Sequence, residues 1–155
     1  MYYNTFTIAH LKLTVFASPN GIERIEINSN PEIPAGYKKA PVSSAVFFGL
    51  HDQLKEYFAG ERKTFSVPLS ITGGTTFQKK VWKQLQRIPY GKTISYKQLA
   101  KAAGSEKAFR AVGNANGKNP IPIIIPCHRV INADGSLGGF SCGIEVKKQL
   151  LAVEK

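Results

Sequence analysis

The chain has few residues of several kinds, and each shortage excludes a class of protein. Only Cys127 and Cys142 are cysteines among its 155 residues, too few for a disulfide framework. The three histidines are scattered and match no zinc-ligand spacing, so we expect reduced thiols and no metal. No apolar run reaches the roughly 18 residues of a membrane span, and no basic, cleavable leader opens the chain. We therefore expect a soluble, cytoplasmic protein with no membrane-spanning segment.

Acidic residues are also scarce, but only in one half of the chain. Residues 1–70 hold 7 Lys and Arg against 6 Asp and Glu, whereas residues 71–155 hold 14 against 4. A concentrated positive charge suits a polyanion, because each phosphate contact releases condensed counterions. The distribution favours a nucleic acid as partner, with an acidic membrane surface or a merely solvated face as the alternatives.

The first half reads as a small α+β unit. LKLTVFA and IERIEI alternate between apolar and polar residues around the turn SPNG, which predicts a β-hairpin. After a polar, Pro-rich loop, apolar residues recur at helical spacing and stop at Gly60, and TFSVPLSI at 64–71 predicts a short strand. The helical stripe consists of Phe47, Leu50, Leu54, Tyr57 and Phe58.

The second half reads as a set of helices that follows a TGGT linker at 72–75. FQKKVWKQLQRI carries one apolar stripe, and Ser95 and Gln98 in SYKQLAKAAG have capping-box spacing. Ser105 is positioned to cap a further helix over 105–116, with Phe109 inward and Arg110 outward. Two short helices around a Gly-containing turn fit a helix-turn-helix or an ordinary αα-hairpin, and the basic charge favours the former. IPIIIP predicts an extended segment, and IEVKKQLLAVEK a terminal amphipathic helix.

The stretch IPCHRVI places Cys127 between a proline and a His-Arg pair. A buried strand cysteine is a common fate for a free thiol. A nucleophile is the alternative, because a cation beside the thiol, here His128 or Arg129, would lower its pKa. Successive strand residues point to opposite faces, so His128 can assist Cys127 only if the backbone turns there, and Pro126 favours such a break.

The ordered set GKTISYKQLA, RAVGNANGKNPIPIIIPCHRVI, GSLGGFSCG and VKKQLLAVE closely resembles the O6-alkylguanine-DNA alkyltransferases, also called methylated-DNA-protein-cysteine methyltransferases. The resemblance is strong over about residues 75–155, whereas the N-terminal part agrees only in size and rough pattern. It implies an α+β chain with an RNase H-like α/β domain over residues 1–71. Residues 72–155 would form a helix-turn-helix, winged-helix-like alkyltransferase domain that binds DNA.

The implied activity is DNA repair by direct damage reversal. The alkylated guanine is flipped out of double-stranded DNA, because its reactive atom cannot be reached inside the stack. A cysteine thiolate then takes the alkyl group irreversibly, once per protein molecule. The damaged base is the donor, so we expect no cofactor, and we expect a monomer. Whether O4-alkylthymine is also a substrate stays open, as does the preferred size of the alkyl group.

The resemblance also implies roles for individual residues. Cys127 would be the acceptor, His128 would take its proton through a bridging water, and Glu154 would orient His128. Tyr96 would protonate the leaving guanine, and Arg110 would fill the gap left by the flipped base.

Further residues would form the pocket and the DNA contacts. Asn119 would tie the helix-turn-helix to the active-site segment. The expected pocket residues are Asn119, Pro122, Val130, Phe140, Ser141 and Cys142. The expected DNA-contacting residues are Lys97, Ser105, Ala108, Arg110, Ala111 and Gly113. The second helix would enter the minor groove, where small residues permit close approach.

Three other functions compete with this one. A non-catalytic relative that only binds alkylated DNA would lack the acceptor cysteine, which is present here. A cysteine hydrolase would leave the basic half and Arg110 unexplained. A transcriptional regulator would need a further regulatory domain, which the chain does not contain.

Overall fold

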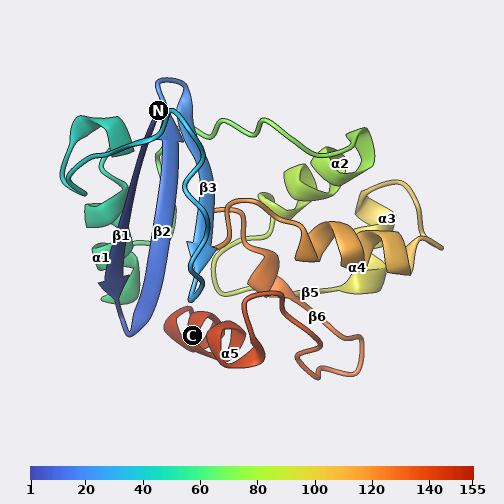
Figure 1. The fold of residues 1–155 in the computed structure, drawn as a ribbon. Coiled ribbons are helices and arrows are strands. Elements are labelled where there is room, and N and C mark those ends of the chain that lie inside the picture. Colours follow the sequence, from blue (N-terminus) through green and yellow to red (C-terminus); the bar gives the residue numbers. More distant parts are fainter. The chain divides into compact units, whose positions relative to one another are not determined.

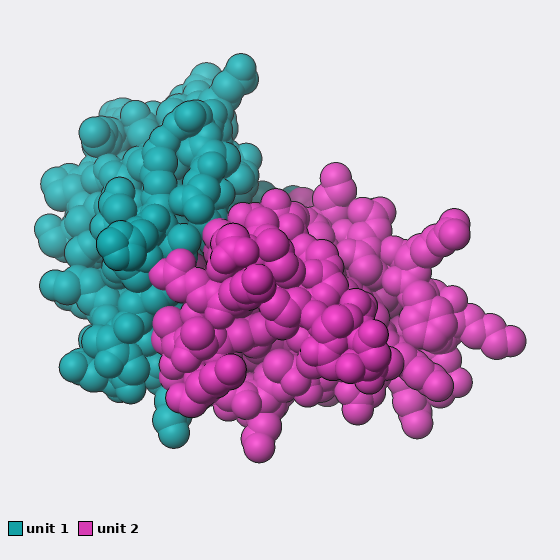
Figure 2. All heavy atoms as spheres, turned by 90° about the horizontal axis from the view of Figure 1, so that it is seen from below, with its two compact units in different colours: residues 1–72 teal, residues 73–155 magenta.

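The computed structural model describes residues 1–155. The chain divides into two compact units, residues 1–72 and 73–155, which Figure 2 shows in teal and magenta. Unit 1 contains the larger sheet and unit 2 most of the helices (Figure 1), which confirms the expected α+β class. None of the helices is long and apolar enough to cross a lipid bilayer.

Unit 1 is built on a four-stranded sheet in the order β3-β2-β1-β4. Its strands are β1 (Tyr2–Ile8), β2 (Leu11–Ser18), β3 (Gly21–Ile27) and β4 (Lys38–Lys39). Strands β2 and β3 are antiparallel neighbours, and Leu13 and Val15 are buried, which confirms the predicted hairpin. Strand β1 was not predicted. It joins β2 through Ala9 and His10, both with positive φ, and this turn lacks the Asn-Gly signature that usually marks a hairpin.

The strand predicted over 64–71 is wrong. Only a single bridge forms, between Ile22 and Leu69, flanked by hydrogen bonds of 2.8 Å from Ile22 N to Pro68 O and from Ser70 N to Ile22 O. Pro68 has no N–H to donate, so the pairing cannot extend from this bridge toward Phe65. The approach is close, because a Cβ at Gly21 would lie 2.5 Å from Pro68 O.

The helical stripe of unit 1 forms two pieces instead of one. The 3₁₀ helix η1 (Ala45–Phe47) is separated from α1 (Leu50–Phe58) by Phe48 and Gly49, which both have positive φ. The stripe still faces the core, since Phe47, Leu50, Leu54 and Tyr57 are all buried.

Unit 2 begins with α2 (Thr76–Leu85), which is capped by a reciprocal capping box between Thr75 and Gln78. The predicted apolar stripe is buried at Val81, Trp82, Leu85 and Ile88. Trp82 also donates from its indole nitrogen to the carbonyl of Ala115, at 2.7 Å, and so links α2 to α4 (Phe109–Gly117).

The two helices of the predicted helix-turn-helix are α3 (Tyr96–Ala102) and α4, and the second starts later than expected. Ser95 and Gln98 form the predicted capping box of α3. Ser105, however, caps nothing. Its N–H bonds to Ala100 O and its carbonyl accepts from Ala108 N, so residues 105–108 form a turn. As a result Phe109 is the first residue of α4 and is 47% exposed, where an inward position was expected.

The segment IPIIIP is a turn and not an extended strand. Ile123 has a φ of 75°, and Ile125 N bonds to Ile121 O at 2.9 Å. The chain then enters the 3₁₀ helix η2 (Cys127–Arg129) and continues into β6 (Val130–Ile131).

A short parallel ladder joins this segment to α3. Strand β6 pairs with β5 (Ile94–Ser95) through Ile94 with Val130 and Ser95 with Ile131. Helix α5 (Ile144–Val153) ends the unit, with Val146 and Leu150 buried as predicted.

Candidate active site

Cys127 lies in the interior of unit 2 and is only 2% exposed. Burial raises the pKa of its thiol to about 12, although a hydrogen bond from Asn119 and the charge of Lys147 oppose the rise. The hypothesis that His128 and Arg129 lower this pKa is therefore not supported. The backbone does turn at the cysteine, in η2, but the turn directs both side chains to Glu154.

His128 and Glu154 form a buried pair. Nε2 of His128 lies 2.7 Å from Oε2 of Glu154, and the side chains are 0% and 2% exposed. Burial lowers the pKa of His128, while Glu154 raises it. Nδ1 of His128 is buried and has no hydrogen-bond partner within the protein. The ring therefore presents one nitrogen that is free to exchange a proton.

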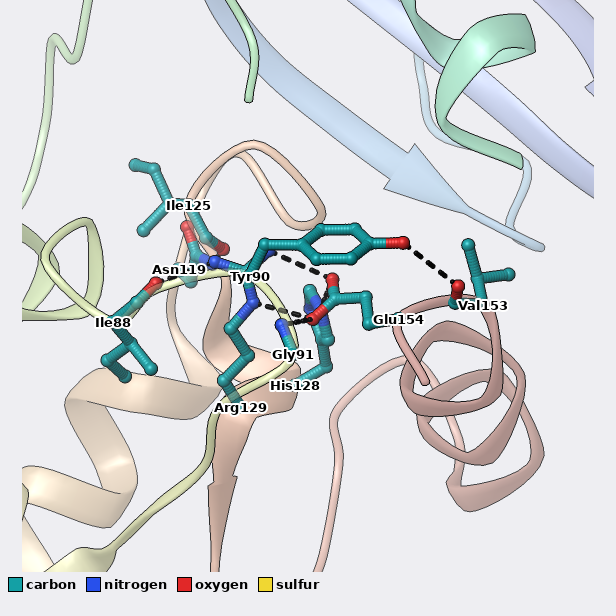
Figure 3. A network of polar contacts seen from close by, with 9 residues as sticks. All are labelled: Ile88, Tyr90, Gly91, Asn119, Ile125, His128, Arg129, Val153 and Glu154. Carbon is teal, nitrogen blue, oxygen red and sulfur yellow. Dashed lines mark hydrogen bonds and ion pairs between the residues drawn. The ribbon is translucent and has the colours of Figure 1, made fainter. Parts of the chain in front are cut away.

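Arg129 completes the network around Glu154 (Figure 3). Its Nε donates to Oε1 at 2.8 Å and its Nη2 to Oε2 at 3.0 Å, while Nη1 donates to Ile88 O at 2.7 Å. Gly91 N approaches Oε1 at 3.4 Å, and Tyr90 Oη donates to Val153 O at 3.0 Å. The carboxylate of Glu154 is thus held by the side chains of His128 and Arg129, which are consecutive in the sequence.

Sequence reasoning did not find this part of the network. The position of Arg129 directly after His128 was an available signal for it. Nothing in the sequence indicates Tyr90 or Gly91, because each contacts the end of the chain across 63 residues.

Asn119 follows α4 and binds the segment before Cys127. Its Nδ2 donates to Ile125 O at 2.7 Å, and its Oδ1 accepts from Ile121 N at 3.0 Å. These bonds stabilise the turn at Ile123. Both bonds go to the segment before Cys127, and the role of Asn119 as a tie to the helix-turn-helix stays a prediction.

A cleft of about 410 Å³ adjoins this site through Asn116, although none of Cys127, His128 and Glu154 lines it. Its walls include Tyr96, Gly113, Asn116, Gly117, Phe140 and Ser141. Asn116 connects the cleft to the cysteine, since its Nδ2 lies 3.4 Å from Cys127 O. Tyr96 is half-buried, and burial raises its pKa, with a smaller contribution from Cys127. The phenol therefore keeps its proton at neutral pH and can donate it.

The expected pocket residues fall into two groups. Phe140 and Ser141 line the cleft. Pro122 and Val130 are buried, and Asn119 and Cys142 are half-buried, and none of the four lines it.

Lys147 is a buried cation that the sequence analysis did not single out. It is 0% exposed, and its Nζ donates to Val130 O at 2.7 Å, to Gly139 O at 3.3 Å and to Leu137 O. It also lies 5.9 Å from the ring of Tyr96 and 6.0 Å from that of Phe140. Burial lowers its pKa, whereas Cys127 raises it. The lysine holds the Gly-rich segment of the cleft against β6.

The expected DNA-contacting residues all lie on α3, on α4 or in the turn between them. Lys97, Arg110 and Ala111 are exposed, and Ser105, Ala108 and Gly113 are half-buried. No three His, Cys, Asp or Glu side chains of the chain gather where they could hold a metal ion.

Comparisons with known proteins agree with this geometry. The family description "6-O-methylguanine DNA methyltransferase, DNA binding domain" matches residues 76–155, and "6-O-methylguanine DNA methyltransferase, ribonuclease-like domain" matches residues 1–71. The chain belongs to the 6-O-methylguanine DNA methyltransferase family.

Individual relatives are similar over part or all of the chain. A methylated-DNA–protein-cysteine methyltransferase of Methanosarcina barkeri is 40% identical over 100% of the chain and 98% of its own length. The constitutive enzyme of Bacillus subtilis is 57% identical over 66% of the chain, and the match spans 62% of its length. The solved structure of Mycobacterium tuberculosis OGT in complex with DNA has a TM-score of 0.91 at 42% identity, over 100% of the chain and 93% of that protein.

Proposed function

We propose that the chain repairs double-stranded DNA by moving the alkyl group of O6-alkylguanine to the thiol of Cys127. The observation that carries this proposal is that Asn116, which lines the cleft, contacts the main-chain carbonyl of the buried Cys127. The residue after Cys127 is His128, which is paired with Glu154. The relatives are named methylated-DNA–protein-cysteine methyltransferases, and one was solved with DNA, which supports the same substrate.

The mechanism begins with removal of a proton from Cys127. His128 accepts it at Nδ1 through a water, and Glu154 stabilises the imidazolium at Nε2. The thiolate attacks the alkyl carbon, a C–S bond forms, and the bond from that carbon to O6 breaks. Tyr96 gives its proton to the guanine that leaves, so that the base departs neutral. Because the thioether is stable, each molecule acts once.

The DNA contacts follow from the charge and shape of α3 and α4. Arg110 is exposed on α4 and is free to fill the gap left by the flipped base. The small residues Ala108, Ala111 and Gly113 allow close approach to a groove, and Lys97 reaches a phosphate. We infer that the protein acts as a monomer in the cytoplasm.

Intact-mass measurement tests the proposal. After incubation with a duplex that carries one O6-methylguanine, the protein should gain the mass of one methyl group, saturating at one per molecule, and peptide mapping should place it on Cys127. Cys127→Ser should gain nothing, whereas the matched control Cys142→Ser should react. Tight lesion binding with no mass gain would reject transfer in favour of a non-catalytic lesion sensor.

A further inference from the structure

Phe109 is an exposed aromatic ring at the start of α4. It is 47% exposed, and the only other large hydrophobic side chain of unit 2 with comparable exposure is Ile144, at 38%. A single exposed apolar residue is ordinary on a protein surface. Its significance depends on where it lies relative to the cleft.

Helical spacing places Phe109 in line with the cleft. Gly113 and Asn116 lie four and seven residues after it on α4, and both line the cleft. With 3.6 residues per turn, these positions form one stripe along the helix. Phe109 is the N-terminal end of that stripe, one turn beyond Gly113.

Arg110 ends a parallel stripe. Asn114 and Gly117 follow it at the same spacings of four and seven residues, and both also line the cleft. The two side chains therefore project from the first turn of α4, about 100° apart around its axis, each at the N-terminal end of a stripe that lines the cleft.

The surface around Phe109 and Arg110 is positively charged, which suits DNA and not an apolar partner. The exposed charged residues of α3, α4 and their flanking turns are Lys97, Lys101, Glu106, Lys107, Arg110 and Lys118, five cations and one anion. Phosphates are attracted to such a surface. An isolated ring among cations is well placed to reach the apolar edges of a groove.

We propose that Phe109 is an apolar wedge that packs in the minor groove of duplex DNA beside the nucleotide that enters the cleft. This inference rests on the proposed function. Extrusion of a base unstacks its neighbours and exposes their apolar faces and the deoxyribose. Arg110 occupies the vacated position, and the ring of Phe109 covers the adjacent step, so the extruded state is favoured.

Transfer rates on three substrates test the wedge. Phe109→Ala should slow single-turnover transfer from an O6-methylguanine duplex about tenfold, the loss expected for one aromatic–base contact. The rate with the free base O6-benzylguanine should not change, because no duplex has to be opened. Transfer from O6-methylguanine in a single strand should be slowed much less than transfer from the duplex. Phe109→Leu should recover part of the duplex rate. The matched control Ile144→Ala should behave as the unmodified protein on all three.

A duplex rate that Phe109→Ala leaves unchanged would overturn the wedge, as would equal slowing on duplex and free base. A second readout does not depend on transfer. In the Cys127→Ser background, 2-aminopurine next to the lesion should brighten on binding, and Phe109→Ala should remove at least half of that increase; an undiminished increase would overturn the wedge. If the unmodified protein transfers nothing from any substrate, the proposed function fails, and the fluorescence still decides on the wedge.

Discussion

Oε2 of Glu154 lies 2.7 Å from Nε2 of His128, and both side chains are shielded from solvent. The same carboxylate receives two hydrogen bonds from Arg129. The guanidinium compensates the buried negative charge and, like burial itself, lowers the pKa of His128. The imidazole is therefore held neutral, in a fixed orientation, with Nδ1 available as a proton acceptor.

Glu154→Gln should damage both activity and stability. The amide cannot stabilise an imidazolium, so transfer should slow on the order of 100-fold. Arg129 would lose its counter-charge in the interior, which should lower the free energy of unfolding by about 3–5 kcal/mol. Urea unfolding and single-turnover rates, measured where circular dichroism shows folded protein, check both effects. Glu145→Gln is the control, since Glu145 is exposed, and it should change neither.

The thiol of Cys127 should stay protonated far above the usual range. Its pKa is raised to about 12, against about 8.5 in an unfolded chain. The native state thus keeps a proton that the unfolded state releases, so stability should fall as pH rises above about 8.5. NMR of protein labelled with ¹³C at cysteine Cβ should show no thiolate shift for Cys127 up to pH 10, while the same carbon in denaturant titrates near 8.5. A native midpoint below pH 9 would contradict the burial argument.

Lys147 and Lys148 provide a matched pair for the buried cation. Lys147→Met leaves the carbonyls of Val130 and Gly139 without their donor, which should cost about 2–4 kcal/mol of stability and slow transfer by loosening the cleft wall. Lys148→Met removes an exposed charge that makes one 3.4 Å ion pair with Glu145, and should cost under about 0.5 kcal/mol. Thermal unfolding of the two variants gives the comparison. Equal melting temperatures of the two variants would show that the hydrogen bonds of Lys147 do not stabilise the folded state.

Binding to undamaged duplex should weaken steeply with salt. The relevant quantity is the slope of log affinity against log salt concentration, which reports the number of phosphates neutralised. Lys101→Gln and Lys107→Gln should each reduce that slope by about 0.9 if the lysine contacts a phosphate. Lys38→Gln, in unit 1, should leave it unchanged. Fluorescence anisotropy over a range of NaCl concentrations provides the slopes, and a flat dependence would argue against the charge-based choice of partner.

Much of the local structure was predictable because it depends on sequence patterns that span only a few residues. The alternation of Leu11, Leu13 and Val15 identified β2, and the capping pair Ser95 and Gln98 identified the start of α3. The family resemblance of PCHRV and of VKKQLLAVE led to His128 and Glu154, which the structure brings together. Each of these signals is contained in a few neighbouring residues or in one continuous motif.

The remaining features depend on competition or on distant contacts. Ser105 has the chemistry of a helix cap, but its backbone closes a turn with Ala108 instead, so α4 starts late and Phe109 is exposed. Lys147 follows an inward-facing Val146, and only the folded chain shows that carbonyls from two other segments surround it. No local pattern encodes such a meeting.

The two-residue parallel ladder between β5 and β6 positions Tyr96 relative to Cys127 without using the side chains that line the cleft. It fixes the helix of Tyr96 to the segment of Cys127 through main-chain bonds, independent of which side chains line the cleft. Phe140 and Ser141 belong to a different loop. We therefore expect that side chains of that loop can be varied to admit larger adducts or synthetic probes while the spacing between Tyr96 and Cys127 stays the same.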